Sequence, residues 1–468
     1  MAGKFTTGET KTRPGVFHRT EKAGGNSAAS AMNGIGAGVL KANWGPLNKV
    51  LEFDAGTSVK TIFGEGQTQD LITEMFNGGI QSGYFIRIGT GGTAPTITLK
   101  AGESDAGTIT GLYVGDRAFT VTIRDSLTED ARECIIYDGT AEFTKVVFES
   151  GDNEPAALEA AMKAANVDFV FTPADGATGK LDNVAQAAFA AGTNPTVTNE
   201  AYSAGFNALE PYSYNVVCID TTDAGVQLLL AAYIDRIFEA GAYPMACVAI
   251  DQEGELDERM KKAAAFNNEK IIAVLNSAID AAGAVQSGYR LAARIGGLVA
   301  ATPANRAITH TVMSGFVDLG EALTNTQIAK ALKSGCLVLT TSRSGQVWVE
   351  QGINTLITPS ADQDEGWKKI RRVKARFELM QRVDDSLEPI IGQLDNDVDG
   401  RATVVATGNG VIKQMVAEKK LTTGTRMMED SANPPAGDSA WFVFEVYDPD
   451  TLEKIYLNYR FRFSTADK

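Results

Sequence analysis

Residues 216–275 decide the fold, and they read VVCIDTTDAGVQLLLAAYIDRIFEAGAYPMACVAIDQEGELDERMKKAAAFNNEKIIAVL. Three short apolar runs, 216–219, 245–250 and 271–275, alternate with two longer segments of helical pattern, 224–239 and 255–267. Another helix is predicted over 286–300. Such alternation predicts an α/β layer with a largely parallel sheet.

The sequence pattern upstream is different: short apolar strands are separated by Gly and Asp turns. They are predicted over residues 97–99, 109–114, 119–123, 134–137 and 143–148. This rhythm is typical of a small β-rich module. Residues 91–199 hold 7 Lys and Arg against 16 Asp and Glu, a net charge of −9, so we expect the module to face water.

The segment between the N-terminus and this module is less regular. Strands are predicted over 59–63 and 84–88, with a small helix over 70–76. The glycine-rich run 34–38 (GIGAG) lacks the preceding strand and following helix that a phosphate-binding loop requires. It is therefore predicted to be a flexible connector.

The last third of the chain opens with apolar runs at 347–350 and 353–357 and continues with helices over 362–387 and 410–420. Residues 441–447 and 455–463 then alternate apolar and polar side chains, which is typical of strands. They are joined by a turn at 448–450, so they form a hairpin or the second strand swings away. A terminal strand needs a partner in its own subunit or in another.

The helix over 362–387 concentrates positive charge in an acidic chain. Its apolar residues follow one narrow stripe. Six cations fall within nine residues: Lys368, Lys369, Arg371, Arg372, Lys374 and Arg376. Like charges at this spacing repel, so the isolated helix gains nothing from them. The face is either a docking surface for an acidic partner or merely solvated.

Composition excludes several classes of protein. The 468 residues carry a net charge of −15, which argues against holding nucleic acid or an anionic membrane. No apolar run could span a bilayer, and the N-terminus lacks a signal peptide, so we expect folding in a cytoplasm. The four cysteines are expected to be free and buried. With two histidines and no metal-ligand spacing, we expect no metal, cofactor or catalytic residue.

Four short motifs together resemble the sheath proteins of contractile phage tails and phage-tail-like bacteriocins. They are Arg13-Pro14-Gly15-Val16-Phe17, similar to the family's Arg-Pro-Gly-Val-Tyr; Trp44-Gly45-Pro46; Gly352-Ile353-Asn354-Thr355-Leu356; and Ile391-Gly392 with Asn396 and Arg401. Their order and the surrounding element pattern extend over most of the chain. The acidic β-rich block matches the family least.

The resemblance implies an α+β and α/β multidomain subunit. Its parts would be an N-terminal extended arm (1–22), an α/β middle domain (23–92 with 200–345), an inserted β-rich outer domain (93–199), an inner α+β domain (346–450) and a donated C-terminal strand (451–468), the family's inner domain being built from both chain ends. Both arms would add strands to neighbouring subunits. The residues implied in this exchange are Arg13, Pro14, Gly15, Val16, Phe17, Ile455, Leu457, Tyr459, Phe461 and Phe463.

The implied function is structural: stacked hexameric rings around a tail tube that contract to drive the tube through a target cell envelope. The basic helix corresponds to the family's tube-facing helix. Partners would be further copies of the chain, the tube protein, and baseplate and tail terminator proteins. The location would be a virion tail or tail-like particle made in the bacterial cytoplasm. Two alternatives stay open: a nucleotide-using α/β enzyme, and a non-contractile polymeric shell.

Overall fold

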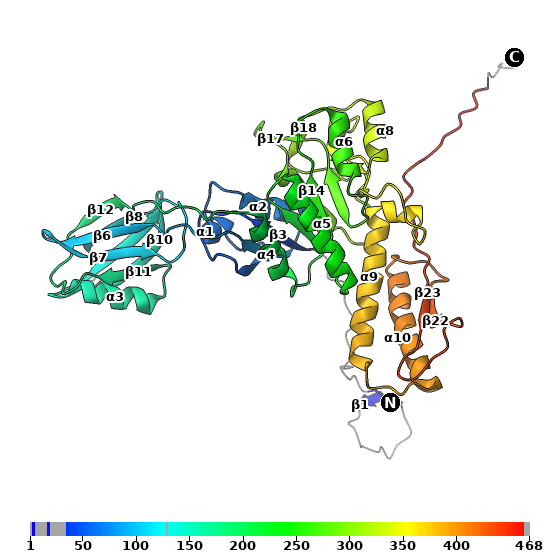
Figure 1. Cartoon of the computed structure of the whole chain (residues 1–468), viewed down its shortest axis with the longest axis horizontal. Helices are drawn as coiled ribbons and strands as arrows, with labels where there is room; N and C mark the ends of the chain where they lie inside the picture. The colour runs from blue at the N-terminus through cyan, green and yellow to red at the C-terminus, as the bar shows by residue number, and fades with distance from the viewer. Residues whose placement is uncertain (1, 5–15, 19–33, 128–129, 463–468) are drawn as a thin grey trace.

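The computed structural model describes residues 2–4, 16–18, 34–127 and 130–462. It is a mixed α/β protein with several sheets, which confirms the fold class at that level. Figure 1 shows three bodies: a β-rich body at one end, a central α/β body, and a helical body with α9 and α10 that extends away from the centre. No helix among the described residues is long and apolar enough to cross a bilayer.

A seven-stranded sheet forms the centre of the molecule. Its strands are, in spatial order, β19 (Cys336–Leu337), β15 (Ile271–Val274), β14 (Met245–Ala249), β13 (Val216–Ile219), β3 (Ile35–Leu40), β5 (Ser82–Arg87) and β4 (Val50–Asp54). Only β4 is antiparallel to its neighbour. The predicted parallel sheet is thus confirmed.

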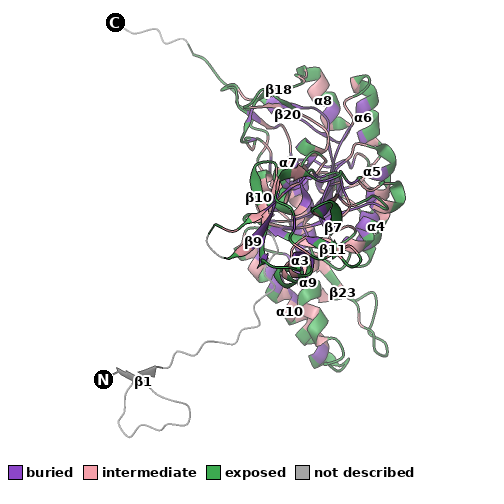
Figure 2. Ribbon diagram, turned by 90° about the vertical axis from the view of Figure 1, so that its left-hand side faces the viewer, coloured by how far each residue is buried: buried purple, intermediate pink, exposed green. Residues whose placement is uncertain are grey.

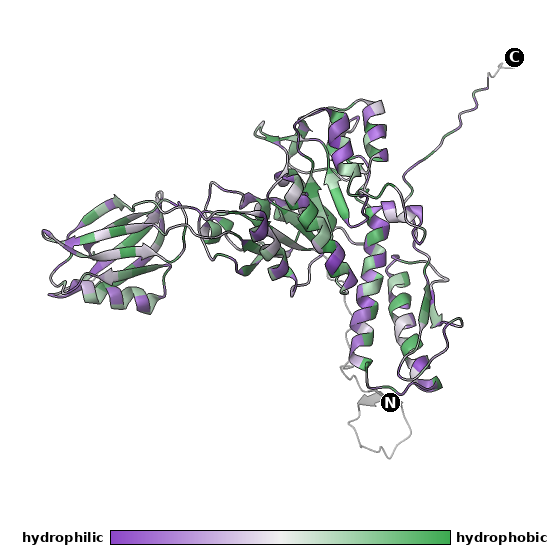
Figure 3. Ribbon diagram, in the orientation of Figure 1, coloured by the Kyte–Doolittle hydropathy of each residue, from purple (hydrophilic) through white to green (hydrophobic). Residues whose placement is uncertain are grey.

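Helices cover both faces of this sheet. The core on one face includes α2 (Asp70–Gly78) and α7 (Tyr289–Ala301), and the core on the other includes α4 (Asn199–Leu209), α5 (Ala224–Glu239) and α6 (Leu256–Ala264). Because the central strands are covered on both sides, they read as continuous apolar runs. Figure 2 shows these strands as buried, and Figure 3 shows them as hydrophobic.

The flexible connector predicted at 34–38 is wrong. Residues 35–38 lie in β3, between β13 and β5. A Cβ on Gly36 would lie 2.7 Å from Met75 Cε, and one on Gly38 would lie 2.7 Å from Leu71 Cδ2. The glycines therefore let α2 pack closely on the sheet; they do not loosen the chain.

The β-rich body consists of two sheets around one core. One sheet has the order β10 (Ala141–Glu149), β9 (Ala131–Asp138), β8 (Thr120–Asp125) and β12 (Val184–Ala188); the other has β11 (Phe169–Pro173), β7 (Ser104–Gly111) and β6 (Thr96–Ala101). Helix α3 (Glu154–Ala165) also packs on this core. The five strands predicted here are confirmed, whereas α3, β11 and β12 were not predicted.

The central body reaches into the β-rich body with one aromatic side chain. Trp44 follows β3, is fully buried, and lies among the rings of Tyr113, Phe119 and Phe169 at centroid distances of 5.3, 4.8 and 5.6 Å. The buried Arg87 guanidinium donates to the carbonyls of Ala42, Gly45 and Val114, so it ties both bodies together.

The helical body departs from the prediction in several places. The helix expected over 362–387 is a 3-10 turn, η1 (Glu365–Lys368), followed by α9 (Ile370–Leu387); the chain is extended at Lys369 between them. Helix α10 (Val398–Ala417) begins well before the predicted 410 and is capped by Asp397, whose side chain accepts from Gly400 N. Residues 353–357 form no strand.

Two further predictions need correction. Residues 59–63, expected as a strand, form α1 (Val59–Phe63), because the Ser58 side chain accepts from Thr61 N and caps the helix. The 441–447 run contains β23 (Phe442–Glu445), but it pairs with β22 (Arg426–Glu429) and not with 455–462, the described part of the second strand. The second of the two alternatives, a segment that swings away, is therefore the one observed.

Smaller elements complete the described chain. They are β1 (Ala2–Lys4), β2 (Val16–His18), β16 (Ala278–Asp280), β17 (Val285–Gln286), β18 (Phe316–Leu319), α8 (Asn325–Lys333), β20 (Leu339–Thr341), β21 (Val347–Val349) and η2 (Glu388–Ile390).

Candidate assembly surfaces

A buried carboxylate lies at the point of the sheet where α/β proteins bind nucleotides. Such ligands bind beyond the carboxyl ends of the strands, where the strand order reverses, here between β3 and β13. The Asp220 carboxylate sits at this point. It accepts from Lys41 N at 2.8 Å, from Tyr202 Oη at 2.5 Å and from Thr68 Oγ1, and Lys41 Nζ lies 3.1 Å away. No anionic ligand fits beside a buried carboxylate so held.

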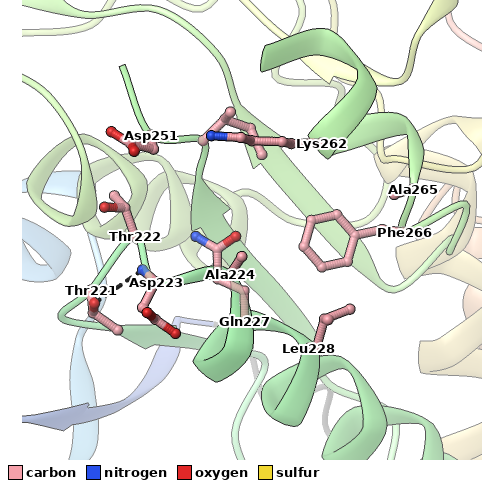
Figure 4. A pocket seen from close by; sticks show the side chains of 11 residues that line it. Thr221, Thr222, Asp223, Ala224, Gln227, Leu228, Asp251, Lys262, Ala265 and Phe266 are labelled. Carbon is pink, nitrogen blue, oxygen red and sulfur yellow. Dashed lines mark hydrogen bonds between the residues drawn. The ribbon is translucent and has the colours of Figure 1, made fainter. Parts of the chain in front are cut away.

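A pocket of about 550 Å³ opens next to it, between the N-terminus of α5 and α6 (Figure 4). Its charged lining groups are Asp223, Asp251 and Lys262. The Asp223 carboxylate already accepts from Val226 N at 3.0 Å and so occupies the helix N-terminus that a phosphate would use. This pocket gives no support to nucleotide chemistry.

The four cysteines are free and buried, as predicted. Burial raises the pKa of Cys134 and of Cys336 to about 12, so neither thiol is a nucleophile near neutral pH. Among the described residues, no group of three His, Cys, Asp or Glu side chains could hold a metal ion.

The residues predicted for strand exchange are placed only in part. Arg13, Pro14, Gly15 and Phe463 lie outside the described residues. Val16 and Phe17 belong to β2, which pairs in parallel with β1 of the same chain. The C-terminal group is described and exposed: Ile455 at 69%, Leu457 at 68%, Tyr459 at 71% and Phe461 at 93%.

This C-terminal segment leaves the subunit in an extended path (Figure 1). Residues 454–462 are all exposed and form no regular secondary structure. Figure 2 shows the same segment as an exposed, extended stretch of chain. The apolar side chains of a strand-like pattern thus lie in water. Exposed apolar surface of this kind is typical of a segment that has a partner elsewhere.

A two-stranded sheet in the helical body has one open edge. Strand β22 is flanked by α10, where the Asn409 amide donates to Met427 O and accepts from Met427 N, at 2.9 and 3.0 Å. The outer backbone groups of β22 at this position are therefore satisfied. Strand β23 pairs only with β22 among the described strands, which leaves its other edge as the one that can accept a strand.

A groove of about 550 Å³ lies between this edge and α9. Its apolar lining comes from Trp367, Leu379, Met380, Val383, Phe444 and Val446. Carboxylates of Asp362, Asp364, Asp384 and Asp448 line it as well. This groove could not be predicted from the sequence, because its walls come from segments far apart along the chain, residues 362–384 and 444–448.

The six cations predicted to face a tube have partners within the chain. Lys368 pairs with Glu365 at 2.8 Å. Lys374 is half-buried and its amine donates to the carbonyls of Val299 and Thr302 at the end of α7. The other four, Lys369, Arg371, Arg372 and Arg376, contact residues 448–453. They are neither merely solvated nor free, and their contact with a tube stays a prediction.

Comparison with known proteins gives a consistent result. Residues 196–355 match the family model of the phage tail sheath protein central domain. The phage-like element PBSX protein XkdK of Bacillus subtilis is 20% identical, over 97% of this chain and 98% of that protein.

Solved structures of sheath proteins share the fold. The sheath tail protein of Desulfitobacterium hafniense superposes with a TM-score of 0.72 at 21% identity, covering 90% of this chain and 97% of that one. The anti-feeding prophage helical sheath in its contracted state gives 0.53 at 10% identity, covering 96% and 99%. Residues 196–355 therefore match the central domain of the phage tail sheath protein family, and the chain as a whole shares the fold of solved sheath tail proteins.

Proposed function

We propose that this subunit polymerises into a contractile sheath, as stacked hexameric rings around a tail tube, and that contraction drives the tube through a target cell envelope. The observation that carries the proposal is the C-terminal segment 454–462, whose apolar side chains are exposed on an extended chain. The likeness to a contracted sheath of the anti-feeding prophage supports the contractile part.

The acceptor of this segment is the open edge of β23 in a neighbouring subunit. A strand added there makes main-chain hydrogen bonds to β23 while its alternate side chains enter the groove beside α9. The groove suits them, because apolar side chains of α9 and β23 line it.

Strand exchange gives the contractile movement its physical basis. A linker of extended backbone can bend while the hydrogen bonds at its end stay intact, so rings can rotate and expand without separating. The N-terminal arm, which includes Arg13–Pro14–Gly15 and Val16–His18, is proposed to make a second link of this kind.

The remaining assignments follow from the same proposal. The inner domain is 346–450 together with the two arms, 1–22 and 451–468, and the middle domain is 23–92 with 200–345. The inserted outer domain, 93–199, faces away from the tube, and the basic segment of α9 faces toward it. The partners are the tube, baseplate and tail terminator proteins, in a phage tail or tail-like particle.

Negative-stain microscopy of the purified protein tests the proposal. We expect long hollow tubes or cogwheel rings. Deleting 1–18 or 452–468 should abolish them while circular dichroism shows a folded chain, whereas deleting only 464–468 is the matched control and should leave them. A protein that stays monomeric under all conditions would refute polymerisation, and tubes that survive both long deletions would refute strand exchange.

A further inference from the structure

The short segment that precedes the exposed arm is held by ionic contacts along α9. Asp448, which follows β23, is the most firmly bound residue of this segment. Arg372 donates to both carboxylate oxygens of Asp448, from Nε to Oδ2 at 2.9 Å and from Nη2 to Oδ1 at 2.7 Å. Arg376 Nε lies 3.1 Å from Oδ2 and makes a third contact. The Asp448 side chain is only 5% exposed, so this forked pair is shielded from water.

Two further carboxylates extend the contact along the helix. Lys369 Nζ lies 2.7 Å from Asp450 Oδ2 and 3.2 Å from Glu453 Oε2. Glu453 also accepts from Gln351 at 2.8 Å and from Thr309 at 2.9 Å, which belong to the central body. Arg371 donates to the Pro449 carbonyl, between Asp448 and Asp450. Residues 448, 449, 450 and 453 are therefore each held by contacts with α9 or its neighbour Lys369.

The contacts stop abruptly after Glu453. Residues 454–462 are exposed, and the contact seen within them is a stacking of Tyr459 on Phe461 at 6.2 Å. The boundary between held and free chain thus falls at one peptide bond, between Glu453 and Lys454.

The two arginines also have partners outside the arm. Asp364 pairs with Arg376 at 2.9 Å and with Arg372 at 3.3 Å, and the Arg376 guanidinium lies 4.5 Å from the centroid of the Trp367 ring. These groups belong to the turn before α9. They hold the two arginines in place and offset the repulsion among like charges on one helix.

We propose that Lys369, Arg372 and Arg376 form a clamp on the root of the C-terminal arm, which sets the point where the arm leaves the subunit and passes tension from the arm into α9. The part that concerns tension rests on the proposed donation of the arm to a neighbour; the clamp itself is a property of the single subunit. A partner of this surface is therefore the chain's own acidic segment 448–453.

Spin labels on the unassembled full-length chain test the clamp. Leu452→Cys and Tyr456→Cys place labels inside and beyond it, and the four native thiols are buried. We expect slow motion at 452 and fast motion at 456. Arg372→Gln should speed the label at 452 severalfold toward the rate at 456 without changing the latter, whereas Lys330→Gln, which breaks an exposed pair with Asp257, should change neither.

A charge-conserving variant separates a specific clamp from a general loss of structure. Arg372→Lys, which keeps a positive charge beside Asp448, should leave the label at 452 slower than Arg372→Gln does. Equal mobility at 452 and 456 in the unmodified background, or no response to Arg372→Gln, would overturn the clamp. These outcomes do not depend on polymers; if deletion of 452–468 abolishes tubes but Arg372→Gln leaves label mobility unchanged, strand donation stands and the clamp falls.

Discussion

At the scale of single residues, Trp44 joins two bodies of the molecule. It belongs to the chain of the central body, but its ring is part of the aromatic core of the β-rich body. We expect Trp44→Ala to lower the free energy of unfolding of the β-rich body by about 3–5 kcal/mol, the usual cost of an aromatic cavity.

Hydrogen exchange and urea unfolding measure this loss. Amides of β6 to β11 should exchange faster, while those of β13 and β14 keep their protection. Trp441→Ala, at a side chain that is 44% exposed, is the control and should change little. Uniform protection across both bodies in the Trp44 variant would contradict the role assigned to this residue.

Lys374 predicts a pH dependence of stability. Burial lowers its pKa to about 7, with Lys420 adding to the effect and Glu378 opposing it. In the unfolded chain the amine keeps its ordinary pKa, so between pH 7 and 9 the unfolded state binds more protons and stability rises with pH. From pH 7 to 9 this gain is roughly 2 kcal/mol.

The measurement is urea unfolding at pH 7, 8 and 9 for the parent chain and for Lys374→Met. Because other groups titrate in both proteins, the difference between them is the quantity that matters. The free energy of unfolding of the parent minus that of the variant should rise by roughly 2 kcal/mol from pH 7 to 9, since the variant lacks the proton that folding expels. A difference that stays constant from pH 7 to 9 would show that Lys374 keeps its ordinary pKa.

At the scale of elements, the sequence predicted what periodicity controls. Strand β13 and helix α5 were predicted to the residue, because buried parallel strands are continuous apolar runs and their helices are long. β3 was missed, since its glycines suggest a loop until the packing of Met75 and Leu71 is known. Helix α1 was not predicted, because its β-branched residues favour a strand. The hydrogen bond from Thr61 N to the Ser58 side chain stabilises the helix against this preference.

The candidate surfaces were predictable to a smaller degree. The alternation of apolar and polar residues from Ile455 to Phe461 predicted the arm, and the positive charge of α9 predicted a binding face. The partner of that charge was not predicted, because Asp448, Asp450 and Glu453 are more than 70 residues from it and meet it only in the folded chain. The groove beside β23 depends on tertiary packing in the same way.

Packing of α2 on the central sheet gives an element-scale prediction. Gly38→Val places its branched side chain where Leu71 and Phe85 lie, both closer than 3.0 Å to the new Cβ. We expect a loss of about 1–3 kcal/mol from overpacking, or more if the strand must shift. Thermal unfolding checks it, with Gly56→Ala as a control, because Gly56 lies on the surface near only Asp54. An unchanged melting temperature for Gly38→Val would contradict the close packing.

A second prediction at the scale of elements concerns the basic residues at the start of α9. Reversing Lys368, Lys369, Arg371 and Arg372 to Glu removes the clamp as well as any face toward a tube. We expect this variant to lose empty sheath polymers, because the root of its arm is repelled from α9. A role confined to the tube predicts instead that polymers form normally but enclose no tube, and microscopy distinguishes the two results.

At the scale of the whole molecule, the subunit is a chain of separate cores joined by short, well-packed contacts (Figure 1). Its thiols are buried, and its described surfaces include an exposed arm and an open strand edge. These features agree with the proposal that the molecule acts in a polymer, through its neighbours.

A cryo-electron microscopy map of the assembled tubes tests this account most directly. The account predicts that an extended strand, residues 455–461 of another subunit, lies hydrogen-bonded along the outer edge of β23, while residues 448–453 remain on α9 of the subunit that donates it. A map in which residues 455–461 fold back onto their own subunit, with the edge of β23 unpaired, would contradict it.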